Sequence, residues 1–296
     1  MPDTQSRYAP DETAASISVL VELATALGAY REDIILVGGW VPYFLVHGNQ
    51  KTFQPDSVRA AALQSAFHIG SLDIDLALNI RTIREPRYQA ISRILEQRGY
   101  RSRGTDSPFS FVRKTQTPKG IPTEIQVDFL APEYGGTGKR RRHQRVQDLL
   151  AHKAHGCDLA FEHFLDREIE ATLPEGGVAK ARIRMADVLP CLAMKAFALR
   201  DRLKEKDAYD IYMVCKHYPG SPESVVRAVK PHVANGLVRE ALSILTDRFN
   251  RPEAMGPVAV ATFLEVRDPT LREIRIRDVY ETVQDVVQRV SNIGLG

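Results

Sequence analysis

The sequence predicts an α+β chain: a mixed sheet with flanking helices, followed by an all-helical C-terminal domain. Up to residue 186, short apolar runs that end at glycine or polar turns, such as Ile34–Val37, alternate with stretches of helical periodicity. From Asp187 onward, nearly every stretch has helical periodicity. The length of 296 residues fits two domains. We therefore expect an α/β domain over residues 1–186 and a helical domain over residues 187–296.

The elements of the first domain follow from apolar spacing and from turn residues. Apolar positions spaced as in a helix cover residues 11–27, and Gly28 stops that helix. A buried strand is expected at 34–37 and a helix at 41–46, with Pro42 in its first turn. The remaining elements expected in this domain are a loop with a short helix at 48–70, strands at 72–80, 109–113, 124–130 and 161–172, and helices at 86–98 and 146–155.

The second domain is expected to contain helices only. Its apolar residues recur at helical spacing over 188–204, 208–216, 222–233, 237–250 and 276–290.

Bulk composition is that of a globular protein without staples. Apolar residues make up 44% and charged residues 26% of the chain. The three cysteines, Cys157, Cys191 and Cys215, form no CxxC pair and are expected to be buried thiols. The N-terminus lacks the apolar core of a secretory signal, and the longest nearly apolar run, residues 34–46, falls short of the roughly 20 residues that span a bilayer. We expect a soluble, cytoplasmic protein without membrane contact.

Two short motifs predict a phosphate and metal site. Gly38 and Gly39 end a buried strand and precede a helix, where backbone N–H groups can approach phosphate. Asp73 and Asp75 alternate with apolar residues in Ser71-Leu-Asp-Ile-Asp, so both carboxylates project from one face of a strand. Two such anions about 4 Å apart repel by roughly 4 kcal/mol near a surface, and bound magnesium ions would offset that repulsion.

A third acid extends this site. Asp128 lies between Val127 and Phe129 on a later strand, on its less apolar face, where it can join the metal ligands and accept the proton of an attacking hydroxyl. Glu124 shares that face and is the weaker candidate.

Basic residues gather in two places. Lys195, Arg202 and Lys206 fall at i, i+7 and i+11 of one expected helix, a stripe suited to a triphosphate, although an exposed face with Lys206–Asp210 pairing is the alternative. The second group follows the Asp128 strand and could bind an RNA backbone, or could be a solvated loop; its members are Lys139, Arg140, Arg141, Arg142 and Arg145.

In this order, the motifs resemble nucleotidyltransferases of the fold shared with DNA polymerase beta. The later block, with Lys195, Lys206, Asp207 and Asp210 leading into Ile211-Tyr212, is similar to the AbiEii/AbiGii toxin group of that superfamily. The resemblance covers roughly residues 30–216, with its motifs at 38–39, 71–76 and 187–212. Trp40 departs from it, because a small hydroxyl residue is usual there.

The resemblance implies a nucleotidyltransferase-type sheet and a set of site residues. Gly38, Gly39 and Ser71 would bind the nucleotide, and Asp73 and Asp75, with Asp128, would hold two Mg²⁺ ions. Lys195 would bind the triphosphate, Lys206 and Asp207 would also contact the nucleotide, and Asp210 would complete the catalytic set.

It also implies a toxin of a toxin–antitoxin system that transfers a nucleotide from an NTP to a hydroxyl acceptor such as RNA or tRNA, opposed by a cognate antitoxin. Two alternatives stay open at this point. One is a catalytically degenerate module that binds nucleotide or a partner, which Trp40 favours. The other is a nucleotidyltransferase for small molecules, like the enzymes that modify aminoglycosides.

Overall fold

The computed structural model describes residues 3–47, 68–80, 82–83, 91–104, 107–133, 143–146 and 149–291. The chain forms two compact units. The sheet unit comprises residues 9–41 and 49–187, and the helical unit comprises residues 1–8, 42–48 and 188–296. The domain boundary that we expected at 186/187 stays a prediction; in the structure two short N-terminal segments group with the C-terminal helices.

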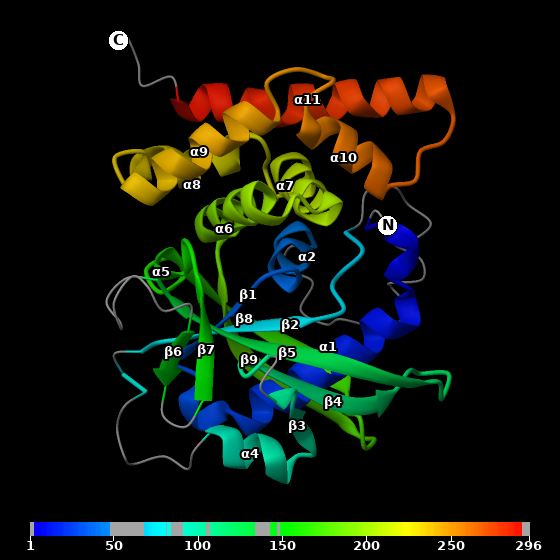
Figure 1. Ribbon diagram of the computed structural model, residues 1–296, viewed down its shortest axis with the longest axis vertical. Coiled ribbons are helices and arrows are strands. Elements are labelled where there is room, and N and C mark those ends of the chain that lie inside the picture. The colour runs from blue at the N-terminus through cyan, green and yellow to red at the C-terminus, as the bar shows by residue number, and fades with distance from the viewer. Residues whose placement is uncertain are drawn as a thin grey trace. The chain divides into compact units, whose positions relative to one another are not determined.

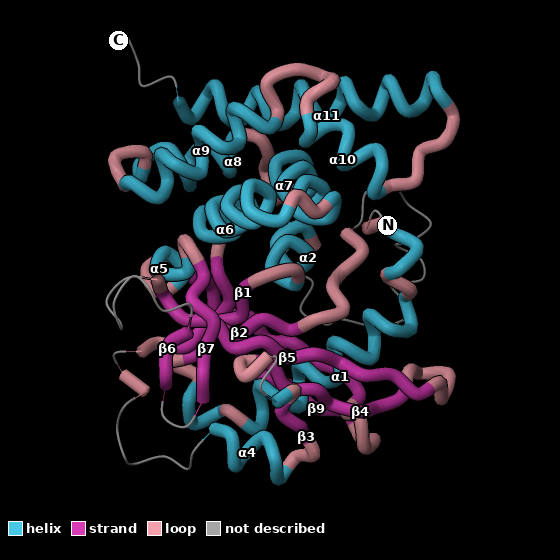
Figure 2. The backbone as a smooth tube through the Cα atoms, in the orientation of Figure 1, coloured by secondary structure: helices cyan, strands magenta, loops and turns pink. Residues whose placement is uncertain are grey.

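The sheet unit is built around one mixed sheet with strand order β3-β4-β5-β2-β1-β9-β8, and β6 and β7 join it through β5 (Figures 1 and 2). The pairs β1/β9, β2/β5 and β5/β7 are parallel, and all other pairs are antiparallel. The strands are β1 (Ile34–Val37), β2 (Ile74–Leu78), β3 (Tyr100–Ser102), β4 (Ser110–Gln116), β5 (Pro122–Pro132), β6 (His143–Val146), β7 (Leu149–Ala154), β8 (Phe164–Thr172) and β9 (Val178–Ala186).

Helix α1 (Pro10–Ala26) covers one face of this sheet. It begins at a proline, whose missing N–H costs nothing in a first turn, and its leucines pack against β1, β2 and β9. Glu22 of α1 is buried because it accepts hydrogen bonds from Tyr100 (2.9 Å) and from Arg113 (3.0 and 3.1 Å) on β3 and β4. Two further α-helices in the described part of this unit are short: α4 (Ile91–Gln97) and α5 (Cys157–Ala160).

Successive residues of a strand project from opposite faces of the sheet, so one set of side chains faces α1 and the other set faces away from it. On β2, Leu76 lines an apolar cavity together with Leu20 and Leu23 of α1, so Asp75 projects from the opposite face. We call that opposite side the open face, meaning the face of the sheet that α1 does not cover.

One expectation about the sheet was wrong, and three of its strands were not expected. The helix expected at 146–155 is instead strand β7, which pairs in parallel with the end of β5. Its short apolar run, Leu149 to Ala151, fits a helix or a strand, and only the long-range pairing with β5 decides between them. Strands β3, β6 and β9 were not expected, although alternating buried Ala181, Ile183 and Met185 indicate β9 in the sequence.

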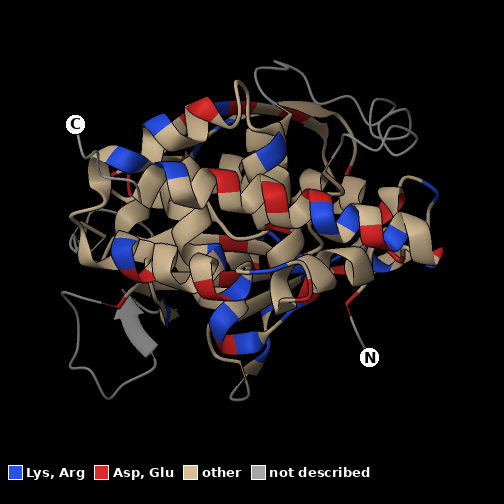
Figure 3. Ribbon diagram, turned by 90° about the horizontal axis from the view of Figure 1, so that it is seen from above, with Lys and Arg blue, Asp and Glu red and all other residues tan. Residues whose placement is uncertain are grey.

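The helical unit confirms the all-helical expectation for the C-terminal part of the chain. Helix α6 packs on α7, α8 and α9, and α11 packs on all of the helices from α7 to α10. Basic and acidic residues are interspersed along these helices (Figure 3). The helices are α2 (Trp40–Val46), α6 (Val188–Arg202), α7 (Glu205–His217), α8 (Glu223–Val229), α9 (Gly236–Arg248), α10 (Met255–Phe263) and α11 (Pro269–Ser291).

Lys195 and Lys206 do not share one continuous helix, which corrects the expected stripe. Helix α6 ends at Arg202 and α7 begins at Glu205. Between them Leu203 has a φ of 51°, in the left-handed region that stops a helix. The chain changes direction there, so spacing counted through the break does not describe one face.

Candidate active site

Strand pairing brings two of the three predicted carboxylates together. Asp75 on β2 is the register partner of Asp128 on β5, and the two strands are parallel. Partners on neighbouring strands lie about 4.8 Å apart and project from the same face. Both side chains therefore belong to the open face, as the sequence predicted, and both are partly exposed.

The glycine turn meets this pair directly. Val37, the last residue of β1, is paired with Asp75, and Gly38 follows with a φ of 73°. A Cβ added at Gly38 would lie 1.9 Å from Oδ2 of Asp75 and 2.6 Å from its Cγ. Gly38 is therefore needed for two reasons: its backbone conformation is one that only glycine adopts easily, and the Asp75 carboxylate occupies the space of a side chain.

Ser71 and Asp73, the other polar members of the Ser71–Asp75 motif, lie just before β2. Asp73 was expected on the strand beside Asp75, but the strand begins only at Ile74, so Asp73 lies in the bend that precedes it and is exposed, whereas Ser71 is buried. Because β1 and β2 are antiparallel, the start of β2 lies beside the end of β1, which places Asp73 at the Gly38-Gly39 end of the pair.

Asp128 is held by two neighbours that the sequence analysis did not single out. Ser110 Oγ donates to Oδ1 of Asp128 at 2.5 Å, and Gln126 Nε2 donates to Oδ1 and Oδ2 at 3.0 and 2.9 Å. Ser110 is the register partner of Asp128 on β4, and Gln126 lies two residues before it on β5. Gln126 could have been found from the sequence, because residues two apart on a strand share a face. Ser110 could not, because its position beside Asp128 depends on the register between β4 and β5. Glu124, the weaker candidate, forms an exposed pair with Lys114.

Trp40 does not fill the glycine turn. Its side chain is fully buried, and its Nε1 donates to Ser16 of α1 at 3.2 Å. Gly70 is close to the indole, since a Cβ there would lie 3.2 Å from it. Trp40 is a core residue. Its presence after the glycines therefore no longer favours the alternative of a catalytically degenerate binding module.

Among the described residues, no group of three aspartate, glutamate, histidine or cysteine side chains lies close enough together to hold a metal ion. The donor chemistry nevertheless suits magnesium: Asp73, Asp75 and Asp128 carry carboxylate oxygens, the kind of donor that Mg²⁺ prefers, and Gly38 has no side chain beside Asp75. The hydrogen bonds from Ser110 and Gln126 leave Oδ2 of Asp128 with a single donor.

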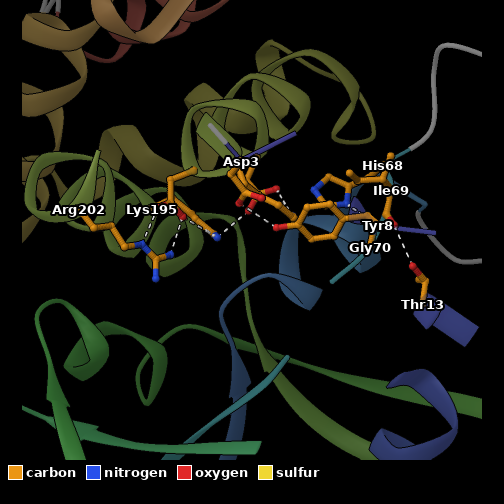
Figure 4. Close-up of polar contacts among 11 residues, drawn as sticks. Asp3, Tyr8, Thr13, His68, Ile69, Gly70, Lys195 and Arg202 are labelled. Atoms are coloured by element: carbon orange, nitrogen blue, oxygen red, sulfur yellow. Dashed lines mark hydrogen bonds and ion pairs between the residues drawn. The ribbon is translucent and has the colours of Figure 1, made fainter. Parts of the chain in front are cut away.

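The basic group of Lys195, Arg202 and Lys206 forms an ionic cluster with two aspartates within the helical unit, and each of the three cations has a carboxylate partner. Lys195 and Arg202 of this cluster are labelled in Figure 4. Lys195 Nζ lies 3.0 Å from Asp207 and 2.6 Å from Asp210. Lys206 Nζ lies 2.8 Å from Asp210, and Arg202 binds Asp207 at 2.7 and 2.8 Å. The expected open cationic stripe is therefore wrong: both lysines and both aspartates are buried and paired with one another.

The charges of this cluster shift one another's titration. Burial opposes the charged form of Asp207, but Lys195 and Arg202 outweigh it and hold the pKa of Asp207 below its ordinary value. Burial also opposes the charged form of Lys195, yet Asp210 and Asp207 raise its pKa well above the ordinary value. For Lys206, burial dominates and the pKa is lowered, with Asp210 offsetting only part of the effect.

Other predicted residues are settled by burial or lie outside the described part. Cys157, Cys191 and Cys215 are buried thiols, as expected. The predicted RNA contacts Lys139, Arg140, Arg141 and Arg142 lie outside the described residues, and Arg145 lies in β6, whose side chains are not described.

Comparison with known proteins identifies the family. The family described as "Nucleotidyl transferase AbiEii toxin, Type IV TA system" matches residues 70–282, more than half of the chain. The chain belongs to the AbiEii family. It is therefore a nucleotidyltransferase, and the family implies an NTP as substrate and an antitoxin as partner.

No curated protein matches the AbiEii chain. A matching solved structure is that of an antigenic nucleotidyltransferase-like protein from Paracoccidioides brasiliensis, with 13% identity and a TM-score of 0.44, over 81% of this chain and 91% of that one. Among the helices that the structure describes, none is both long and apolar enough to cross a bilayer.

Proposed function

We propose that this AbiEii protein transfers a nucleoside monophosphate from an NTP to a hydroxyl of an RNA acceptor, with tRNA as the first candidate, and that the reaction depends on magnesium. Asp73, Asp75 and Asp128 would hold the ions. Gly38, Gly39 and Ser71 would contact the nucleotide. Lys195, Lys206, Asp207 and Asp210 remain predicted members of the site on family resemblance, and a cytoplasmic location is proposed from the three buried thiols.

In this proposal the acceptor oxygen attacks the α-phosphorus in line, forming a new P–O bond while the bond to the β-phosphate oxygen breaks and pyrophosphate leaves. Asp128 takes the proton of the attacking hydroxyl. Magnesium would neutralise charge that develops on the phosphate oxygens. Positioning and electrostatic stabilisation by the sheet residues would account for most of the rate.

One observation carries the proposal: the contact between the glycine turn and the acidic strand. The missing side chain at Gly38 lies against the Asp75 carboxylate, and Asp75 is in register with Asp128. A turn at which only glycine fits, beside two aligned carboxylates, is what a site for a triphosphate and its cations requires. A turn that merely connects two elements can require a glycine for its backbone conformation, but it does not require a carboxylate in the space of the missing side chain.

The test is to incubate the protein with each of the four NTPs, labelled at the α-phosphate, and with total RNA. We expect labelled RNA that depends on Mg²⁺, and a loss of at least about 1,000-fold for Asp73→Ala or Asp75→Ala with unchanged thermal unfolding. Asp33→Ala, an acid at the opposite end of β1, is the matched control and should retain transfer. Full activity of either Asp73→Ala or Asp75→Ala would refute the assigned roles.

The acceptor class is tested in the same assay. If label appears only on a small hydroxyl compound such as an aminoglycoside, the small-molecule alternative is correct. If the protein binds NTP but labels neither RNA nor a small hydroxyl compound, it has no transferase activity and the catalytically degenerate alternative is correct. The antitoxin partner is tested in cells whose growth this protein inhibits. Restored growth when the product of a neighbouring gene is co-expressed would support that partner.

A further inference from the structure

Gln126 and Ser110 both donate hydrogen bonds to the Asp128 carboxylate, and their surroundings allow the Gln126 amide only one orientation. Arg103 Nη1 donates to the Gln126 amide oxygen Oε1. A guanidinium has no acceptor, so Oε1 must face Arg103 and the Gln126 NH₂ group must face Asp128. An ionised carboxylate has no donor, which matches that NH₂ group and the Ser110 hydroxyl.

The same chain of contacts fixes the direction of the carboxylate. Ser110 donates from the neighbouring strand at 2.5 Å, and Gln126 donates from the same strand at 2.9 and 3.0 Å. The two donors therefore reach Asp128 from different directions in the plane of the sheet. Hydrogen bonds to an ionised group are about twice as strong as neutral ones, so this pair restricts the rotation of Asp128.

From these contacts we propose that Ser110 and Gln126 are positioning residues, which hold the Asp128 carboxylate in place for the acceptor hydroxyl, and that Arg103 orients Gln126. The inference rests on the proposed function, since it assigns Asp128 to the acceptor side. It adds three residues that lie on strands β4 and β5 and just after β3, none of them in the motifs that predicted the site. Arg103 is exposed and reaches Gln126 along the open face.

The decisive substitution is Gln126→Glu, which preserves size and shape but replaces the donor with a second anion beside Asp128. We expect kcat for nucleotide transfer to fall about 30-fold or more, with the KM for NTP within about 2-fold and an unchanged midpoint of thermal unfolding. Ser110→Ala is expected to lower kcat about 10-fold, and Ser110→Thr to restore most of it. Arg103→Met should have the smallest effect, about 3-fold, because Gln126 keeps its own bonds to Asp128.

The chain offers matched controls. Gln116→Glu makes the same chemical change on the same face of the β4–β5 hairpin, near its turn, and Thr115→Ala removes a hydroxyl from the opposite face of β4. Both should transfer nucleotide like the unmodified protein. If Gln116→Glu lowers kcat as much as Gln126→Glu, added charge on the hairpin explains the result and the inference fails.

A double-mutant cycle separates this inference from the proposed function. In an Asp128→Asn background, Ser110→Ala and Gln126→Glu should cause no further loss, because the group that they position is already gone. Additive losses would overturn the positioning role. If Asp128→Asn itself retains full transfer, the assignment of Asp128 is wrong; if Asp128→Asn is inactive while Ser110→Ala and Gln126→Glu are active, only the positioning role is wrong.

Discussion

Single residues decide the shape of the candidate site, and Gly38 is the clearest case. It combines a φ of 73° with a carboxylate oxygen where a side chain would be. The first property is shared by many turn glycines, whereas the second ties the glycine motif to Asp75. The two consequences can be measured separately, because one concerns backbone strain and the other concerns the position of a catalytic group.

We expect Gly38→Ala to lower the free energy of unfolding by about 1–2 kcal/mol through backbone strain, and to lower transfer at least about 100-fold by displacing Asp75. Gly120→Ala is the matched control, because Gly120 has a φ of 77° but nothing within 4 Å of an added Cβ. It should show a similar loss of stability and normal transfer. Equal activity of the two variants would contradict the close contact at Asp75.

Leu203 is the reverse case, a residue with a side chain where glycine is preferred. Its φ is 51° and its relative exposure is 51%, so it carries strain and contributes little burial. We expect Leu203→Gly to raise the free energy of unfolding by about 0.5–1 kcal/mol, the relieved strain exceeding the extra entropy of glycine. Leu203→Ala keeps a Cβ and should change stability little in urea denaturation; a gain as large as that of glycine would remove strain as the cause.

Between elements, charges connect α6 to α7. Lys195 on α6 is bound by Asp207 and Asp210 on α7, and Asp207 also binds Arg202 from the end of α6. Lys195, Lys206, Asp207 and Asp210 are buried and pair with one another, whereas Arg202 remains exposed. Removing one partner from such a cluster leaves a buried charge uncompensated, which is more costly than the net contribution of the cluster itself.

Asp207→Asn is therefore expected to lower the free energy of unfolding by about 3–5 kcal/mol at pH 7. The pKa of Asp207 is lowered in the folded protein, so its contribution is present above the pKa of the unfolded chain, about 3.9, and is lost as the pH falls further. The variant should accordingly show a weaker decline in stability below about pH 4. Asp201→Asn, at an exposed pair on α6, should cost less than about 1 kcal/mol and leave that pH dependence intact.

At the scale of the whole molecule, the N-terminal segment belongs to the helical unit. Tyr8 donates to Asp3 at 3.0 Å, its ring lies 5.2 Å from Lys206 Nζ, and it packs on Phe263. The backbone N–H of Asp3 donates to Glu205, and Gln5 donates to the carbonyl of Leu264, both across more than 200 residues of sequence. Residues 3–8 thus contact α7 and the end of α10, which lie more than 190 residues later in the sequence.

Tyr8→Ala is expected to lower the free energy of unfolding of the full chain by about 2–3 kcal/mol, because it removes ring packing, a cation–π contact and a hydrogen bond. Tyr8→Phe keeps the ring and should cost only about 1 kcal/mol, from the bond to Asp3. Chemical denaturation monitored by circular dichroism would compare them. A cost for Tyr8→Phe equal to that of Tyr8→Ala would show that the hydroxyl, and not the ring, stabilises this segment.

Local patterns determined much of this protein. The run Ile34–Val37 before two glycines, and the alternation around Asp75, were enough to predict β1, the turn and strand β2, because strand geometry and glycine conformation are short-range properties. They did not show that β2 begins only after Asp73. Tertiary structure alone decided the rest. Residues 149–154 form a strand only because β5 pairs with them, Lys195 meets carboxylates only because the chain turns at Leu203, and Ser110 reaches Asp128 through a register between strands. Pairing across long separations depends on contacts that no local spacing contains.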